Sequence, residues 1–155
     1  MRTVTLLLMC LSIALVAGCQ EGNVNAKLWM MGGPDVDNPH TELIGRVGLE
    51  AESIEVGAES LWVGVHGDHQ SYGAYALGHL GEGPAGRAYI GYHASIIDAE
   101  DGGLYGPIGG TTIQVNDQLA TVVEYQYRSF TGELDDLYPE SSQEHRVYAG
   151  IVLKF

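Results

Sequence analysis

The chain has 155 residues and a pI near 4.6, which suits one domain with a sizeable buried surface and no second module. Twenty acidic residues against seven basic ones give a net charge of −13, which argues against nucleic acid as a partner. The two cysteines both lie among the first nineteen residues, so no internal disulfide is expected in the mature chain.

Residues 1–18 are predicted to be a secretory signal peptide. Arg2 gives a short positive region, and the apolar run 4–17 is too short to span a membrane as a helix. The stretch "LVAGC", residues 15–19, resembles the lipobox of bacterial lipoproteins, which implies cleavage before Cys19 and lipidation of that residue. An ordinary signal peptidase site at the same place is the alternative. Either cut removes Arg2 and leaves six basic against twenty acidic residues, a net charge of −14.

Residues 19–24 are expected to form a lipid-anchored linker, and residues 25–155 the folded domain. Gln20, which follows the cysteine, implies the outer rather than the inner membrane for a lipoprotein of this kind. No helical period persists for three turns in the domain, and 22 glycines are poor helix residues. The pattern instead has a period of two. It predicts eight strands at 25–31, 41–50, 53–65, 71–80, 86–97, 105–115, 119–130 and 145–155.

The connections between these strands alternate in length. Long polar stretches such as "GGPDVDNPH" and "TGELDDLYPESSQE" alternate with short ones such as "AE" and "NDQ". Outer-membrane barrels combine an even strand number, long outer loops and short periplasmic turns. The sequence therefore resembles small OmpA-like or OmpX-like barrels in architecture. The resemblance implies an all-β, eight-stranded, up-and-down antiparallel transmembrane barrel with both termini in the periplasm.

Strand register can be tested at two short connections. A two-residue turn at Ala51 and Glu52 pairs Leu49 with Ile54 and separates apolar from charged side chains. The charged face then carries Arg46, Glu55 and Glu59. The connection 116–118 similarly predicts pairing of Ile113 with Thr121 and of Thr111 with Val123.

Alternating strands of this kind suit two barrels that differ in which face meets solvent. A soluble barrel keeps its apolar row inside, whereas a membrane barrel turns that row toward lipid and its charges toward the lumen. An eight-stranded barrel is just wide enough for side chains to fill, so lumen charges would have to pair. The predicted lumen network comprises Arg46, Glu55, Glu59, Glu124, Arg128, Arg146 and Lys154, with Glu42 and Glu50 as further acids.

The final strand favours the membrane barrel. "YAGIVLKF" resembles the assembly signal of outer-membrane barrels through Tyr148, Gly150, Leu153 and the terminal Phe155, although Leu153 replaces the aromatic residue often found there. The resemblance implies recognition by the barrel assembly machinery. One face of this strand, with Val147, Ala149, Ile151, Leu153 and Phe155, is expected to meet lipid. Trp62, Tyr72, Tyr105 and Tyr127 lie near loop ends and suit either an interfacial girdle or core packing.

Two sequence features could carry chemistry. "YHAS" places His93 and Ser95 on one face of a strand, which resembles the His-x-Ser pair of outer-membrane lipid A deacylases, although that pair lies on the penultimate strand of those enzymes. Hydrogen bonding in the lumen is the alternative. "HGDH" offers His66, Asp68 and His69 as weak metal ligands, with solvated turn residues as the alternative.

These observations predict a structural or surface-interaction protein of the outer membrane rather than an open pore. Its partners would be outer-membrane lipids and, at the acidic loops, a surface protein or divalent cations. No cofactor is expected. The loop acids are Glu133, Asp135, Asp136 and Glu140, for which solubility of an exposed loop is the other explanation. A soluble lipocalin-like lipoprotein with an apolar ligand is the second hypothesis, and a lipid A-modifying enzyme the third.

Overall fold

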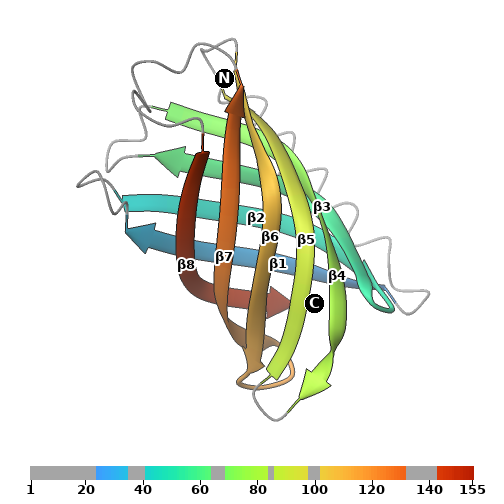
Figure 1. Ribbon diagram of the computed structural model, residues 1–155. Coiled ribbons are helices and arrows are strands. Elements are labelled where there is room, and N and C mark those ends of the chain that lie inside the picture. Colours follow the sequence, from blue (N-terminus) through green and yellow to red (C-terminus); the bar gives the residue numbers. More distant parts are fainter. Residues whose placement is uncertain (1–23, 35–40, 64–68, 84–85, 98–101, 132–142) are drawn as a thin grey trace.

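The computed structural model describes residues 24–34, 41–63, 69–83, 86–97, 102–131 and 143–155. They form one closed barrel of eight antiparallel strands in which every strand pairs with its neighbours in sequence and β1 pairs with β8 (Figure 1). The strands are β1 (Val24–Pro34), β2 (Thr41–Ala51), β3 (Ile54–Val63), β4 (His69–Gly83), β5 (Gly86–Ile97), β6 (Gly103–Gln114), β7 (Leu119–Thr131) and β8 (Gln143–Lys154). The predicted eight-stranded antiparallel barrel is confirmed.

No helix among these described residues is long and apolar enough to cross a membrane. The signal peptide, Cys19 and most of the linker lie outside the described residues and stay predictions.

The barrel has two unlike ends. At the end that we call the turn end, the chain crosses between strands through the short connections 52–53, 84–85 and 115–118, and β1 begins and β8 ends there. The opposite end, the loop end, receives the longer connections. The strands are strongly tilted, and in Figure 1 the turn end lies toward the lower right. Tilt of this kind is what closes a sheet of eight strands into a barrel.

β6 contains Pro107 and several glycines, which are unfavourable in a strand. Pro107 faces outward and is exposed, and it pairs with Tyr92 of β5. On the other side, pairing with β7 is interrupted at Gly106 and Pro107 and resumes at Ile108. Proline cannot donate to a ladder, so the interruption accommodates it without ending the strand.

The predicted register between β2 and β3 is wrong by two residues. Leu49 pairs with Val56 rather than Ile54, so the turn consists of Glu52 and Ser53. Glu52 has φ of +57°, in the left-handed region that such two-residue turns require. A shift of two residues leaves every side chain on its predicted face, because side chains alternate with a period of two. The predicted pairing of β6 with β7 is confirmed, including Ile113 with Thr121.

Candidate functional site: the polar lumen and the apolar belt

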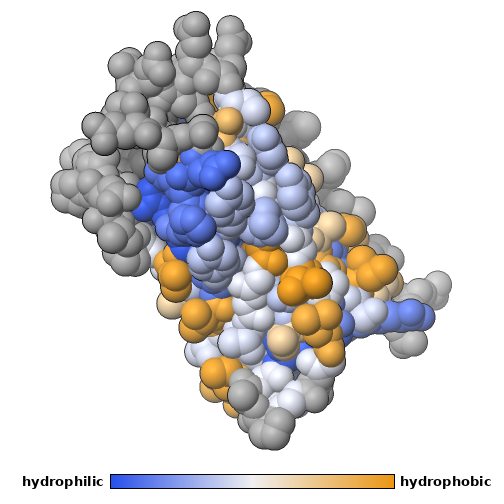
Figure 2. Space-filling view, in the orientation of Figure 1, coloured by the Kyte–Doolittle hydropathy of each residue, from blue (hydrophilic) through white to orange (hydrophobic). Residues whose placement is uncertain are grey.

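The outer surface of the barrel is rich in large apolar side chains. Among the large apolar side chains that the structure describes, fifteen are exposed, with Ile96 at 70% and Phe155 at 66%. They are Met30, Leu43, Ile54, Val56, Leu80, Ile90, Tyr92, Ile96, Tyr105, Ile113, Val115, Val123, Tyr125, Val147 and Phe155, and we call them the apolar belt. Figure 2 shows orange side chains gathered on the half of this face nearer the turn end, with paler and blue residues toward the loop end.

The interior has the opposite character. Within the described strands, nine charged residues have relative exposures of 4% or less, and they alternate along the strands with the outward-facing residues. They are Lys27, Glu42, Arg46, Glu50, Glu55, Glu59, Glu124, Arg128 and Arg146. Buried charges require opposite charges and hydrogen bonds to offset the loss of water. Three groups of contacts provide them.

The first group lies toward the turn end and centres on Glu55, which is fully buried. Its carboxylate accepts hydrogen bonds from Lys27 Nζ at 2.9 Å and from Trp29 Nε1 and Tyr75 Oη at 2.7 Å each. His79 Nε2 lies 3.3 Å from the same carboxylate. One acid thus joins side chains from β1, β3 and β4.

The second group lies in the middle of the lumen and centres on Arg46. Its Nε donates to Glu59 at 2.7 Å, and its Nη1 donates to Glu124 at 2.6 Å. The guanidinium also lies 4.9 Å from the centre of the Tyr75 ring. Tyr89 Oη donates to Glu124 at 2.8 Å. Arg46 therefore links strands on opposite parts of the barrel wall.

The third group lies toward the loop end around Glu42. Arg128 Nη1 donates to Glu42 at 2.9 Å, and the Tyr148 hydroxyl contacts both residues. Arg146 pairs with Glu144 at 2.8 Å and lies 4.0 Å from Glu42. Gln126 joins the second and third groups by donating to Glu124 and accepting from Arg128.

Of the residues expected in the lumen, Arg46, Glu55, Glu59, Glu124, Arg128 and Arg146 belong to these three groups. Lys154 lies apart, at the turn end, where its Nζ donates to Gln114 Oε1 at 2.6 Å. Five partners in these groups were not predicted as members of the network: Lys27, Trp29, Tyr75, Tyr89 and His79. The pattern left the faces of β4 undefined, and the partners of the others depend on which strands meet inside the barrel.

Glycines make room for the lumen tyrosines. The ring of Tyr75 lies over Gly48 and Gly57, which are direct cross-strand partners on β2 and β3. A Cβ built on Gly57 would lie 2.8 Å from Tyr75 Cε1, and one built on Gly110 would lie 2.6 Å from Tyr89 Cζ. In an interior this narrow, a side chain at these positions would displace a ring that holds Glu55 or Glu124.

The lumen also has an apolar layer at the loop end. Met31, Ile44 and Leu61 are cross-strand neighbours on β1, β2 and β3, and each is 2% exposed. Ile97 and Leu104 are buried at the same end, on β5 and β6. The expectation that apolar residues face lipid therefore does not hold for these residues, which face the lumen. They belong to the buried apolar cluster of the lumen and add no charges that would need partners.

His93 and Ser95 both face the lumen, and both contact the same acid. His93 Nδ1 lies 2.9 Å from Glu59 Oε1, and Ser95 Oγ donates to that oxygen at 3.1 Å. The hydroxyl is thus directed to the carboxylate rather than to the imidazole. Of the weak metal candidates, His66, Asp68 and the side chain of His69 lie outside the described residues, as do the four loop acids.

The residues of the assembly motif divide between the two faces. Tyr148 and Gly150 face the lumen, whereas Leu153 and Phe155 face outward. The four aromatic residues expected near loop ends all face outward. Among them, Tyr105 packs 6.5 Å from Tyr92, and Tyr127 packs 5.2 Å from His145, measured between ring centres. These positions fit an interfacial girdle better than core packing.

No protein-family model matches the chain, and no curated protein matches it. Two similar solved structures are both designed proteins. One comes from work on the de novo design of transmembrane β-barrels, with 14% identity and a TM-score of 0.61. The other is the solution NMR structure of the designed protein TMB2.3, with 18% identity and a TM-score of 0.63. Each match covers 88% of this chain and 98% of the other. At this identity the likeness shows the fold, which is that of transmembrane β-barrels.

Proposed function

We propose that the protein is an outer-membrane barrel with a structural or surface-interaction role and no open pore. The observation that carries the proposal is the polarity of the described residues, of which nine charged side chains are buried inside and fifteen large apolar ones are exposed outside. A soluble monomer with this many large apolar side chains exposed to water would be unusual. Lipid around the apolar belt would remove that surface from water. The paired charges would stay inside the barrel, away from the lipid.

The filled lumen supports a structural role. Arg46 and Arg128 reach across the interior to acids on distant strands, and Met31, Ile44 and Leu61 are buried in the same interior. We expect reconstituted protein to give no stepwise conductance in planar bilayers at neutral pH. Steady ion-conducting steps would contradict the absence of a pore.

Electrophoresis of detergent-extracted protein tests membrane insertion. Transmembrane barrels pair every strand edge and so are expected to stay folded in SDS until boiled. The unboiled protein should therefore migrate differently from the boiled protein. Equal mobility, together with a Cys19→Ala variant that stays soluble in buffer without detergent, would contradict the proposal.

The same proposal places both termini in the periplasm, with Cys19 lipidated and the acidic loops outside. Mass spectrometry of the mature protein should show a lipid-modified Cys19, and Cys19→Ser should lack that mass. For the loops, we propose contact with divalent cations or a basic surface protein. Neutralising Glu133, Asp135, Asp136 and Glu140 together should weaken Mg²⁺ binding measured by calorimetry, and an unchanged isotherm would leave solubility as the role of these acids.

The two alternatives are less well supported. A lipocalin-like protein needs an apolar interior for its ligand, whereas Arg46, Glu59 and Glu124 occupy this one. For the enzyme, Ser95 is 6% exposed and bonded to Glu59, so we propose that His93 and Ser95 serve the lumen network. Loss of a lipid A modification in Ser95→Ala, with the barrel still folded, would instead favour the enzyme.

A further inference from the structure

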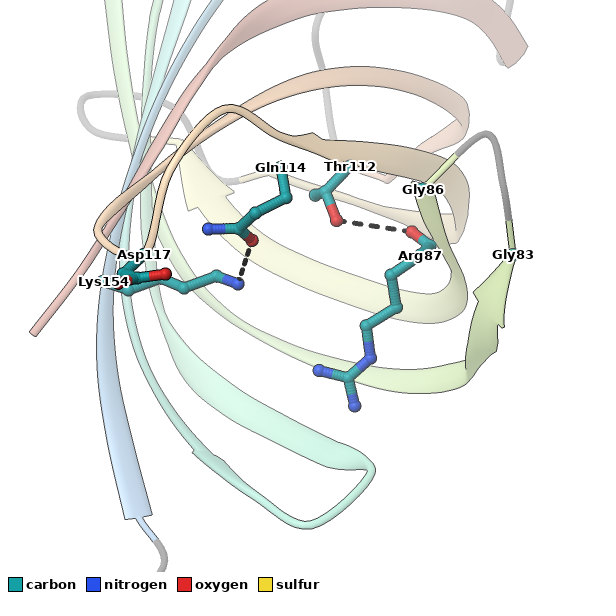
Figure 3. Close-up of a pocket in the computed structure, with 7 residues that line it drawn as sticks. All are labelled: Gly83, Gly86, Arg87, Thr112, Gln114, Asp117 and Lys154. Atoms are coloured by element: carbon teal, nitrogen blue, oxygen red, sulfur yellow. Dashed lines mark hydrogen bonds between the residues drawn. The ribbon is translucent and has the colours of Figure 1, made fainter.

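The polar groups at the turn end of the barrel bond one another. A pocket of about 400 Å³ lies there, beside the connections between β4 and β5 and between β6 and β7 (Figure 3). In its wall Lys154 Nζ donates to Gln114 Oε1 at 2.6 Å. Arg87 donates to the Glu50 carboxylate and, at 3.2 Å, to Glu52 O. These cations therefore have partners without a ligand, and the outer surface is a better place to look for one.

The outer surface of the described strands lacks acidic and strongly basic side chains. No Asp, Glu, Lys or Arg is among the outward-facing side chains that the structure describes on these strands. Figure 2 shows blue side chains gathered toward the loop end of β7 and β8. Five outward polar side chains are adjacent in that region. They are Tyr125, Tyr127, Ser129, Gln143 and His145, and we call them the β7–β8 polar patch.

Register and ring contacts hold the β7–β8 polar patch together. Tyr127 and His145 are direct cross-strand partners, as are Ser129 and Gln143. The His145 ring lies 5.2 Å from the Tyr127 ring and 5.9 Å from the Tyr125 ring, measured between centres, and its Nδ1 contacts the Tyr125 hydroxyl. Tyr125, Gln143 and His145 are exposed. The patch thus presents aromatic rings beside hydroxyl, amide and imidazole groups.

This combination suits the chemistry of a neutral sugar. A sugar ring has apolar C–H faces and hydroxyl groups at its edge, and tyrosine likewise joins an apolar ring to a polar hydroxyl. The amide of Gln143 and the hydroxyl of Ser129 can each donate and accept hydrogen bonds. Among the described outward side chains, an anionic ligand would meet at most one cation, the imidazole of His145. It would also be repelled by the acids in the connection between β7 and β8, which are Glu133, Asp135, Asp136 and Glu140.

The apolar belt extends from this patch toward the turn end. On β8 the outer face continues from His145 through Val147 to Phe155, and on β7 it continues from Tyr125 to Val123. A lipid with its headgroup at the patch would place its acyl chains along this part of the belt. A free sugar would make only the headgroup contacts.

We propose that the β7–β8 polar patch binds the neutral sugar headgroup of a glycolipid whose acyl chains lie on the apolar belt. The inference rests on the proposed function, because the belt must lie in lipid for the patch to meet a headgroup. Tyr72 supplies a matched comparison. It also faces outward near the loop end and bonds to a neighbouring side chain, Gln70, but it lies on β4, away from the patch.

NMR titration of the mature protein, folded in deuterated phosphocholine micelles, tests the patch with three probes that share an octyl chain. They are octyl glucoside, the uncharged tetraethylene glycol monooctyl ether, and octyl phosphate. We expect saturable shifts of the Tyr127 and His145 amide signals with octyl glucoside. The other two probes should bind about threefold more weakly or less, because they lack the sugar contacts.

Variants locate the binding. Tyr127→Ala and Gln143→Ala should each weaken octyl glucoside binding by about threefold or more, as loss of a ring contact or a hydrogen bond implies. Tyr72→Ala should leave it unchanged. The heat-dependent mobility shift checks that each variant is folded, and the comparison of probes on the unaltered protein does not depend on the variants.

Equal binding of octyl glucoside and the tetraethylene glycol ether would overturn the proposal, because the patch would then be an ordinary aromatic girdle. Tighter binding of octyl phosphate, or equal effects of Tyr72→Ala and Tyr127→Ala, would overturn it too. Protein that shows the mobility shift but no preference for the sugar leaves membrane insertion intact and contradicts this inference alone.

Discussion

Arg46 lies between two carboxylates, Glu59 and Glu124, and each of these buried groups depends on the others for compensation of its charge. A buried ion pair adds little net stability compared with apolar residues of the same size, but removal of one member leaves an uncompensated charge. The lumen groups therefore matter most through the cost of breaking them. They also require one arrangement of the strands, because each acid finds its partners only in one register.

Arg46→Met should lower the free energy of unfolding by about 3–5 kcal/mol, since it leaves Glu59 and Glu124 buried without their cation. Urea unfolding of the barrel in lipid vesicles, followed by circular dichroism, measures the change. Adding Glu59→Gln and Glu124→Gln to Arg46→Met should recover more than half of the loss. A triple variant no more stable than Arg46→Met would show that buried charge is not the cause.

Gly48 tests the packing of lumen rings on glycine. A Cβ at Gly48 would meet the Tyr75 hydroxyl and would lie 2.9 Å from Glu55 Oε1. Gly48→Ala should therefore cost about 1–3 kcal/mol of stability, as overpacking does elsewhere. The matched control is Gly109→Ala on β6, where the nearest atom to the new Cβ would be 3.9 Å away.

Both glycine variants can be compared by their urea midpoints in the same vesicles. Tyr75→Phe removes the hydroxyl from the contact and should reduce the additional cost of Gly48→Ala. Equal losses for Gly48→Ala and Gly109→Ala would contradict this account of the lumen.

At the scale of elements, the sequence of the β2–β3 hairpin predicts the faces of its strands but not their register. Alternation predicts both faces correctly. A shift of the pairing by two residues preserves those faces, so alternation leaves the register undetermined. The observed register puts Glu50 directly opposite Glu55, although like charges in that position repel each other. Lys27 of β1 bonds both acids, at 2.8 and 2.9 Å. A residue of a third strand thus stabilises the observed register. The sequence of the hairpin alone does not predict this contact.

In the candidate site too, alternation predicts the face of a side chain but not its partners. Arg46, Arg128 and Arg146 are predicted to face the lumen because each lies opposite an apolar row. The glycine pairs beneath the tyrosines and the apolar layer at the loop end depend on which strands meet inside the barrel. In β4, small residues and aromatic ones alternate without a clear polar face, so Tyr75 and His79 had no predicted direction.

The last strand carries a prediction of its own. Phe155 is 66% exposed, and its N–H donates to Ala26 O at 2.9 Å, so its side chain adds little to the packing within the barrel. If it is part of the assembly signal, its deletion should lower the amount of folded barrel in cells by several fold while barrel refolded in detergent keeps its stability. Phe155→Tyr, which keeps the aromatic ring, is the control. Normal levels after deletion would mean an ordinary strand end.

At the scale of the whole molecule, polarity is inverted relative to a soluble barrel. Acids and bases pair inside, large apolar residues lie exposed outside, and the fold closes all strand edges. Designed transmembrane barrels share this fold at 14–18% identity. The inverted pattern, rather than any one motif, is what this chain has in common with membrane barrels in general.

The two tryptophans test this inversion most directly, because they lie on opposite sides of the wall. Trp29 is fully buried in the lumen and bonded to Glu55, whereas Trp62 faces outward. Quenching of their fluorescence by brominated lipid chains can be measured in Trp29→Phe and Trp62→Phe proteins that show the heat-dependent mobility shift. We predict strong quenching of Trp62 and weak quenching of Trp29. Equal quenching of both, or none of Trp62, would contradict a barrel whose apolar belt lies in lipid.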